Sequence, residues 1–208
     1  MKFLIAIVLA FVGISAEAVE VEASIGSTVF TKPSNTIWYQ QEFPHQFDLQ
    51  SVSYSIGVTD YLTSSTRWRV AYTRLGQVSS VASATSDDQY SHGCRHNCPM
   101  NTYRTEGSVR GFSFTVAPET QIGSVKVFAE AGAFVFLPKF IATIDGCSIS
   151  TQQYSEGWKV GPQIGVGAEY RNMQIVLTGY RVDSTTSNVD AVPNWQGWAV
   201  NLALRKRF

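Results

Sequence analysis

Apolar and polar side chains alternate along most of the chain after residue 18. The clearest example is the last fifteen residues, where the apolar parity consists of Trp198, Val200, Leu202, Leu204 and Phe208. Small and polar side chains occupy the other parity, and Lys206 is the one charged residue on the apolar parity. A period of two places the two sets on opposite faces of a β-strand. The pattern therefore predicts a strand with one apolar and one polar face.

The same reasoning predicts eight strands in the whole chain. They cover residues 20–30, 48–58, 66–75, 104–116, 123–137, 157–170, 173–182 and the last fifteen. The connections alternate strictly in length: 31–47, 76–103, 138–156 and 183–194 are long, whereas 59–65, 117–122 and 171–172 are short. An outer-membrane barrel requires this alternation, because its periplasmic turns are short and its extracellular loops are long. We therefore predict an all-β fold, an eight-stranded antiparallel up-and-down transmembrane β-barrel.

The first eighteen residues have a different character. Lys2 gives a positive start, residues 3–12 are apolar, and Ala16-Glu17-Ala18 fits an A-x-A cleavage site. These are the features of a secretory signal peptide, and the apolar run is too short to span a bilayer as a helix. We expect residues 1–18 to be removed after Sec-type export and residues 19–208 to form one barrel domain.

The charge and composition of the chain limit what the protein is expected to bind. The 16 Lys and Arg residues balance the 16 Asp and Glu residues, so no basic excess points to nucleic acid. Only 15% of the residues are charged and 12% are aromatic, a composition that excludes a disordered chain. We expect a monomer that binds no nucleic acid and no cofactor.

The sequence resembles the Gram-negative eight-stranded outer-membrane barrels of the OmpA/OmpX-like group. The resemblance lies in the A-x-A signal, the Gly-Val-Gly-Ala-Glu-Tyr run at 165–170, the Tyr180-Arg181-Val182-Asp183 segment and the terminal strand. It implies an outer-membrane location in contact with lipid and lipopolysaccharide. It also implies that the barrel-assembly machinery reads Trp198, Val200, Leu202, Leu204 and Phe208 as an assembly signal. Lys206 departs from that signal, which usually has an apolar residue at this position.

The polar parities predict what fills the barrel. Eight strands enclose a space just wide enough for side chains, and buried charges are tolerated only when they are paired or solvated. We expect salt bridges and water to fill the lumen; the alternative is a narrow gated solute path, which single-channel recording would detect. The expected interior residues are Arg67, Arg69, Lys126, Glu130, Lys159, Gln163, Glu169, Asn201 and Arg205.

Three cysteines fall in the expected extracellular segments. Cys94, Cys98 and Cys147 would pass through an oxidising compartment, so a disulfide is expected. Three cysteines leave one over, and sequence alone does not fix the pairing. His92, Cys94, His96 and Cys98 also form a weaker candidate metal site, because their alternate spacing differs from the C-x2–4-C pairs of usual zinc sites.

The leading functional hypothesis is a non-enzymatic surface barrel. Its extracellular loops would contact a host surface, a phage or another ligand, with a role in adhesion or envelope integrity. The alternative is a lipid A-modifying enzyme, for which the only match is His45, Asp48 and Ser51, close together near the first long loop. Activation of a nucleophile requires its base within hydrogen-bonding distance, a condition that spacing alone does not establish.

Deletion of Phe208 tests the proposed assembly signal. We expect a lower yield of heat-modifiable protein in pulse-labelled outer membranes, because every strand edge stays exposed until the last strand closes the barrel. Phe30→Ala serves as the comparison and should lower the yield less. Assembly of the truncated chain at the normal rate would show that Phe208 is only an interfacial aromatic.

Overall fold

The computed structural model describes residues 19–31, 45–84, 101–145, 150–155, 157–184 and 195–208. Its strands are β1 (Glu20–Phe30), β2 (His45–Asp48), β3 (Gln50–Thr63), β4 (Thr66–Ala84), β5 (Asn101–Ile122), β6 (Val125–Asp145), β7 (Ser150–Ser155), β8 (Lys159–Tyr170), β9 (Met173–Ser184) and β10 (Trp195–Arg207). None of the described segments is a helix long and apolar enough to cross a membrane.

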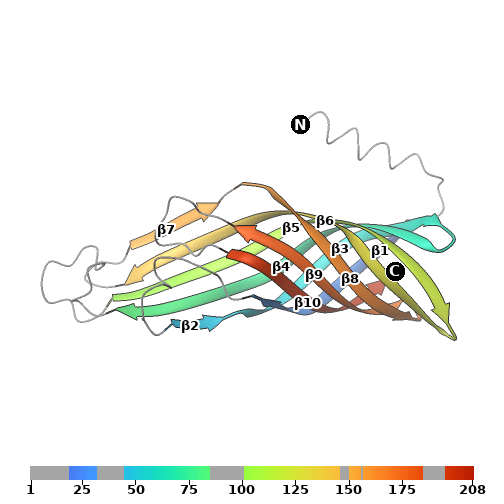
Figure 1. Cartoon of the computed structure of the whole chain (residues 1–208), viewed down its shortest axis with the longest axis horizontal. Helices are drawn as coiled ribbons and strands as arrows, with labels where there is room; N and C mark the ends of the chain where they lie inside the picture. Colours follow the sequence, from blue (N-terminus) through green and yellow to red (C-terminus); the bar gives the residue numbers. More distant parts are fainter. Residues whose placement is uncertain (1–18, 32–44, 85–100, 146–149, 156, 185–194) are drawn as a thin grey trace, which may run out of the picture.

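Eight of these strands close into a barrel. Each pairs antiparallel with the next around the ring β1, β3, β4, β5, β6, β8, β9 and β10, and β10 returns to pair with β1 (Figure 1). The closing register runs from Glu22 opposite Arg207 to Phe30 opposite Ala199. Closure leaves no strand edge for lipid to solvate, which is the condition for crossing a bilayer with strands. This confirms the predicted eight-stranded antiparallel barrel.

At the loop end the strands extend further than the alternation of apolar and polar residues predicted. β4 continues to Ala84 and β5 begins at Asn101, inside the segment 76–103 that was expected to be loop. β7 also lies in an expected loop, and so does β2 except for Asp48. β2 pairs with β4 beyond β3, and β7 pairs with β6 beyond β8. In the β4 extension from Val78 to Ala84, Val and Ser occur on both parities, so the alternation that marks a strand with one face toward lipid is missing there.

The other end of the barrel is closed by tight turns. Ser64-Ser65, Gly123-Ser124 and Arg171-Asn172 each separate two paired strands. Gly123, Arg171 and Asn172 have positive φ values of 63°, 49° and 64°, and positive φ suits the right-handed twist of strands joined by short hairpins. The predicted short connection 117–122 is wrong in its bounds, because β5 continues to Ile122. Both termini of the barrel lie at this turn end (Figure 1).

A β-bulge in β4 changes which side chains enter the lumen. Arg74 pairs with Arg110 and Gly76 pairs with Val109, so Leu75 is the extra residue. Gly76 has φ of 95°, and a Cβ there would lie 2.2 Å from Ser51 Oγ, which explains the glycine. A bulge of this kind reverses the facing of the strand beyond it. Leu75 keeps the inward parity of Arg69 and Thr73, whereas Val78 is buried because the parity changes at the bulge.

The outer wall of the barrel carries an apolar band. On β5 the outward side chains from Phe112 to Ile122 include no charge. Ten steps along a strand tilted by about 45° give a height of roughly 24 Å, close to the apolar band of outer-membrane barrels. The exposed apolar side chains of the wall include Ile25, Val29, Val52, Tyr54, Ile56, Phe112, Phe114, Val116, Ile164, Val166, Ile175, Leu177, Val200, Leu202 and Leu204.

An arginine on the outer face of β10 tests this assignment. Leu202 is 55% exposed on the wall, whereas its neighbour Ala203 is 8% exposed and faces the lumen. We expect Leu202→Arg or Val200→Arg to lower the free energy of unfolding in lipid by about 2–4 kcal/mol, measured by urea titration of the refolded barrel. Ala203→Ser should have a much smaller effect, and equal losses would mean that the facing of β10 is reversed.

Candidate functional site

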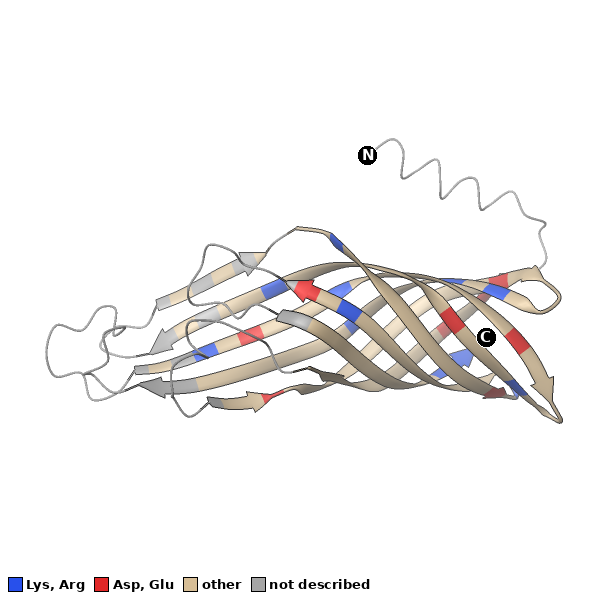
Figure 2. Cartoon of the chain, in the orientation of Figure 1, with Lys and Arg blue, Asp and Glu red and all other residues tan. Residues whose placement is uncertain are grey.

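The lumen of the barrel is divided into a polar half and an apolar half. Toward the turn end its side chains are charged, amidic or hydroxyl-bearing, and toward the loop end they are aromatic and aliphatic. Figure 2 shows charged segments gathered toward both ends of the barrel, with a largely uncharged zone between them. The polar filling expected from sequence therefore accounts for only one half of the lumen.

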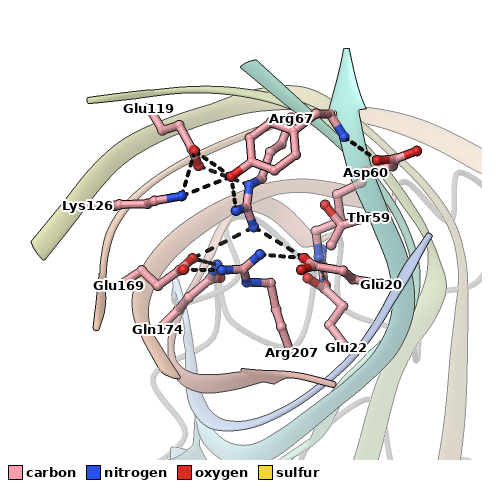
Figure 3. Close-up of polar contacts among 12 residues, drawn as sticks. Glu20, Glu22, Thr59, Asp60, Arg67, Glu119, Lys126, Glu169, Gln174 and Arg207 are labelled. Atoms are coloured by element: carbon pink, nitrogen blue, oxygen red, sulfur yellow. Dashed lines mark hydrogen bonds and ion pairs between the residues drawn. The ribbon is translucent and has the colours of Figure 1, made fainter. Parts of the chain in front are cut away.

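The turn-end mouth of the lumen is filled by an ion-pair network (Figure 3). Arg67 is the link between its two parts: Arg67 Nε lies 3.0 Å from Glu119 Oε2, and Arg67 Nη1 lies 3.6 Å from Glu20 Oε2. Arg207 pairs with both Glu20 and Glu169, so it ties β10 to β1 and β8. The network therefore joins the first and last strands of the chain at the point where the barrel closes.

Tyr61 and Lys126 complete the mouth network. Tyr61 Oη donates to Glu119 Oε1 at 2.8 Å, and Lys126 Nζ donates to Tyr61 Oη at 2.9 Å. The guanidinium of Arg67 lies 4.2 Å from the centroid of the Tyr61 ring. The phenol thus serves as a donor, as an acceptor and as a cation–π face, which satisfies three charged neighbours with one side chain.

A second network crosses the lumen deeper in the barrel. Arg69 pairs with Glu22, Arg205 Nε lies 3.8 Å from Glu22 Oε1, and Arg205 Nη1 lies 3.3 Å from Glu130 Oε2. The charges alternate along this chain, which runs from β4 through β1 and β10 to β6. Because positive and negative groups follow one another in this chain of contacts, each buried ion lies beside an ion of opposite charge, and burial of a charge requires such a partner.

Neutral donors satisfy the remaining oxygen atom of Glu130. Thr178 Oγ1 donates to Glu130 Oε1 at 3.0 Å, and Gln163 Nε2 lies 3.5 Å from the same atom. Asn201 belongs to a neighbouring cluster, where its amide nitrogen donates to Thr28 Oγ1 at 2.8 Å and to Ser53 Oγ. Glu130 is thereby held in place by groups from β8, β9 and β10.

The charges of the two lumen networks balance. Their ion pairs join the carboxylates of Glu20, Glu22, Glu119, Glu130 and Glu169 to the cations of Arg67, Arg69, Lys126, Arg205 and Arg207. The cavity beside Arg69, Asn201 and Arg205 has a volume of about 10 Å³, which is room for a single water molecule. The polar half of the lumen is therefore packed and neutral.

Aromatic side chains close the loop-end half of the lumen. Phe134 and Phe136 are completely buried, and their rings stack at 5.4 Å between centroids. Tyr180 meets the Phe134 ring edge-on at 5.0 Å. Leu75, on the inward parity of β4, belongs to the same cluster. The other buried members are Phe30, Val78, Val109, Phe140, Val182 and Ala199.

The interior residues expected from sequence are not all brought together. Arg67, Lys126 and Glu169 lie in the mouth network; Arg69, Glu130, Gln163 and Arg205 lie in the deeper one; Asn201 lies beside it. Lys159 is at the loop end of β8, half-buried and lining a pocket with Arg181 and Asp183. It lies ten residues along the strand from Glu169.

The sequence reasoning missed Tyr61, Glu119, Glu20 and Arg207, which is more than half of the mouth network. Tyr61 and Glu119 fell in expected short connections, because β3 and β5 were assigned ends that are too early. Glu20 and Glu22 share a parity in β1, and Arg207 shares the inward parity with Arg205. Opposite charges on one parity of strands that must pair with each other are the signal that identifies these partners.

The other candidate sites are only partly described. Cys94, Cys98, Cys147, His92 and His96 lie outside the described residues. At the candidate enzyme site, Asp48 Oδ1 accepts a hydrogen bond from the backbone N–H of Gln50 at 3.3 Å, and Ser51 Oγ accepts one from the backbone N–H of Gln77 at 2.7 Å. The Ser51 oxygen thus has a structural partner beside the β4 bulge.

Comparison with known proteins finds similarity at the level of structure. No protein-family model matches the sequence, and no curated protein matches it. Similar solved structures include Neisserial surface protein A, with a TM-score of 0.40, 13% identity and coverage of 93% of this chain and 99% of that one. They also include the attachment invasion locus protein Ail of Yersinia pestis in complex with the heparin analogue sucrose octasulfate (TM-score 0.39, 14% identity, coverage 92% and 100%).

A third similar structure is the N-terminal β-barrel domain of Pseudomonas aeruginosa OprF, with a TM-score of 0.32, 12% identity and coverage of 92% and 100%. At these identities and TM-scores no activity is transferred from these proteins to this chain.

The assignment of the chain rests on the closed ring of eight strands, its apolar outer band and its packed lumen. The chain is an eight-stranded outer-membrane β-barrel.

Removal of the Glu130 carboxylate tests the deeper network. We expect Glu130→Ala to lower the free energy of unfolding by roughly 3–5 kcal/mol, because it leaves Arg205 buried without its closest carboxylate. Thr178→Val is the control: it removes one neutral donor to the same carboxylate and should cost about 1 kcal/mol. Equal losses in a denaturant titration would show that the ion pair adds nothing beyond a neutral hydrogen bond.

Proposed function

We propose that this barrel acts at the cell surface through the structures at its loop end, in adhesion or in another contact with a host or phage ligand. The observation that carries the proposal is the contrast between its two ends. The turn end stops at tight turns and a neutral ion-pair network, whereas strands at the loop end continue beyond the apolar band.

The filled lumen supports a surface role over transport. A permeating solute would have to displace the stacked rings of Phe134 and Phe136 and then separate Arg205 from Glu130. Separating a buried pair leaves uncompensated charges, which costs several kcal/mol. A packed lumen of this kind suits a barrel whose body is an anchor.

The continuing strands support the loop end as the functional part. β4, β5 and β6 remain paired past the outward residues Arg74, Arg110 and Lys139, as far as Ala84, Asn101 and Asp145. β2 pairs with β4 and β7 pairs with β6 on the two sides of this extension, which projects at the end opposite the termini (Figure 1). A paired sheet holds the segments that it carries in fixed positions, which lowers the entropy lost on binding.

Excision of the β4–β5 extension tests the proposal. Ser79 and Glu106 are register partners, so residues 80–105 can be replaced by Asn-Gly, a pair that favours a two-residue hairpin turn. We expect the shortened protein to reach the outer membrane with normal heat-modifiable migration, and cells that express it to lose adhesion to host cells.

The matched control changes the opposite end of the barrel. Insertion of a short hydrophilic epitope between Gly123 and Ser124 alters the β5–β6 turn, at the end where the termini lie, and should leave adhesion intact. Unchanged adhesion of the excised variant, at equal surface abundance, would contradict a role of this extension. A changed lipid A mass on deletion of the gene, with unchanged adhesion, would favour a lipid A-modifying enzyme.

A further inference from the structure

Three cations on neighbouring strands point outward from the barrel wall. Arg74 on β4 and Arg110 on β5 are exposed, and Lys139 on β6 is half-buried. In the part of the chain that the structure describes, none of the three forms an ion pair. Arg181, an outward cation on β9, differs because its Nε lies 2.9 Å from Asp183 Oδ2. We call Arg74, Arg110 and Lys139 the outer basic cluster.

The register brings the charges of this cluster close together. Arg74 is directly opposite Arg110, and Lys139, opposite Ser108, is the diagonal neighbour of Arg110. Side chains of directly opposite residues are close, and like charges placed there destabilise the sheet. The arrangement therefore carries a repulsion that an anion bound between the guanidinium groups would remove.

The cluster lies at one boundary of the apolar band. On β4 the outward side chains Trp68, Val70 and Tyr72 precede Arg74, and on β5 Arg110 precedes Phe112 and the apolar wall. On β6 the outward run from Val125 to Leu137 contains no charge and is followed by Lys139. Each of these three strands thus carries its first outward charge at the loop-side boundary of the band, which in an outer-membrane barrel lies at a membrane–water interface.

A pocket joins the three cations on the outer wall. It has a volume of about 250 Å³, and its polar lining side chains are Arg74, Gln77, Glu106, Ser108, Arg110 and Lys139. Glu106 is its only carboxylate, and Glu106 Oε2 accepts a hydrogen bond from Gln77 Nε2 at 2.7 Å. With three cations and one carboxylate the lining has a formal charge of +2. Leu137 and Ile141 give the pocket an apolar side.

We propose that the outer basic cluster binds the phosphate groups of a phosphorylated glycolipid of the outer leaflet, that is, of lipid A. Arginine recognises phosphate through paired N–H donors and keeps its charge near a membrane. The apolar wall directly below the cluster would receive the acyl chains of the same lipid. This inference rests on the outer-membrane placement of the barrel and adds a lipid site to its proposed surface role.

Lipid retention by the purified protein tests the site. The full mature chain, extracted from outer membranes and exchanged into detergent, is titrated with bisphosphorylated lipid A and examined by native mass spectrometry. We expect Arg74→Gln/Arg110→Gln to weaken retention by about tenfold or more, because charge-assisted bonds to phosphate are lost. Lys206→Gln removes an outward cation at the turn end, where Lys206 Nζ lies 5.0 Å from the Phe208 ring centroid, and should leave retention unchanged.

Two further comparisons distinguish a lipid site from a site for small anions. Glu106→Gln removes the only carboxylate of the pocket and should strengthen retention. Dephosphorylated lipid A should bind weakly, and millimolar inorganic phosphate should not displace the lipid. Equal retention by the double variant and the wild type, or equal binding of dephosphorylated lipid A, would overturn the proposal; displacement by inorganic phosphate would overturn it in favour of a small-anion site.

Stability in two membranes gives a readout that a purely structural role would not produce. In phosphatidylcholine vesicles we expect the double variant to be at least as stable to urea as the wild type, because it lacks the Arg74–Arg110 repulsion. In vesicles that contain lipid A the order should reverse, and the same order in both vesicles would contradict a phosphate site. Neither measurement involves adhesion, so failure here is distinguishable from failure of the proposed surface function.

Discussion

The structure depends on one constraint, that a backbone surrounded by lipid must find every hydrogen-bond partner within the protein. The pairing of β10 with β1, from Arg207 opposite Glu22 to Ala199 opposite Phe30, meets that constraint by closing the ring. Closure then fixes the facing of every strand, because alternate side chains must point either to lipid or into a narrow lumen. The apolar wall and the crowded interior are both consequences of this one pairing.

Filling the lumen is achieved in two physically different ways. At the loop end Phe134, Phe136 and Tyr180 pack as an apolar core, which needs no partners. At the turn end buried ions are arranged in alternating order, so that Glu22, Arg205 and Glu130 each meet an opposite charge. A charge placed among the aromatic rings, or a phenyl ring placed among the ions, would leave buried polar groups without partners. The division of the lumen is thus a requirement of its narrow width.

The two ends of the barrel differ because their connections differ. Tight turns such as Arg171-Asn172 bring the strands to a stop at the boundary of the apolar band, and the ions of the mouth network close the lumen behind them. At the other end the bulge at Leu75 and Gly76 marks the level where the wall becomes basic and the sheet continues as an extension. The bulge therefore stands at the change from the apolar-walled barrel to the paired extension beyond the apolar band.

The sequence by itself determined the number of barrel strands, their closure and the facing of most of them, because lipid on one side and a lumen on the other impose a period of two. The strand from residue 173 to 182 is the exception, since both of its parities are partly apolar and its facing does not follow from the sequence. The sequence also placed Arg69, Glu130 and Arg205 inside. Only the tertiary structure decided the rest. The strand extensions to Ala84 and from Asn101 lack the alternation, because neither of their faces meets lipid. The partners of Arg67 come from other strands, Tyr61 from β3 across the β3–β4 turn and Glu119 from β5, and they depend on how those strands pair with β4. The pairing of Arg74 with Arg110 likewise depends on the β4–β5 register. A one-residue shift in either register would separate these groups, and no local pattern fixes that shift.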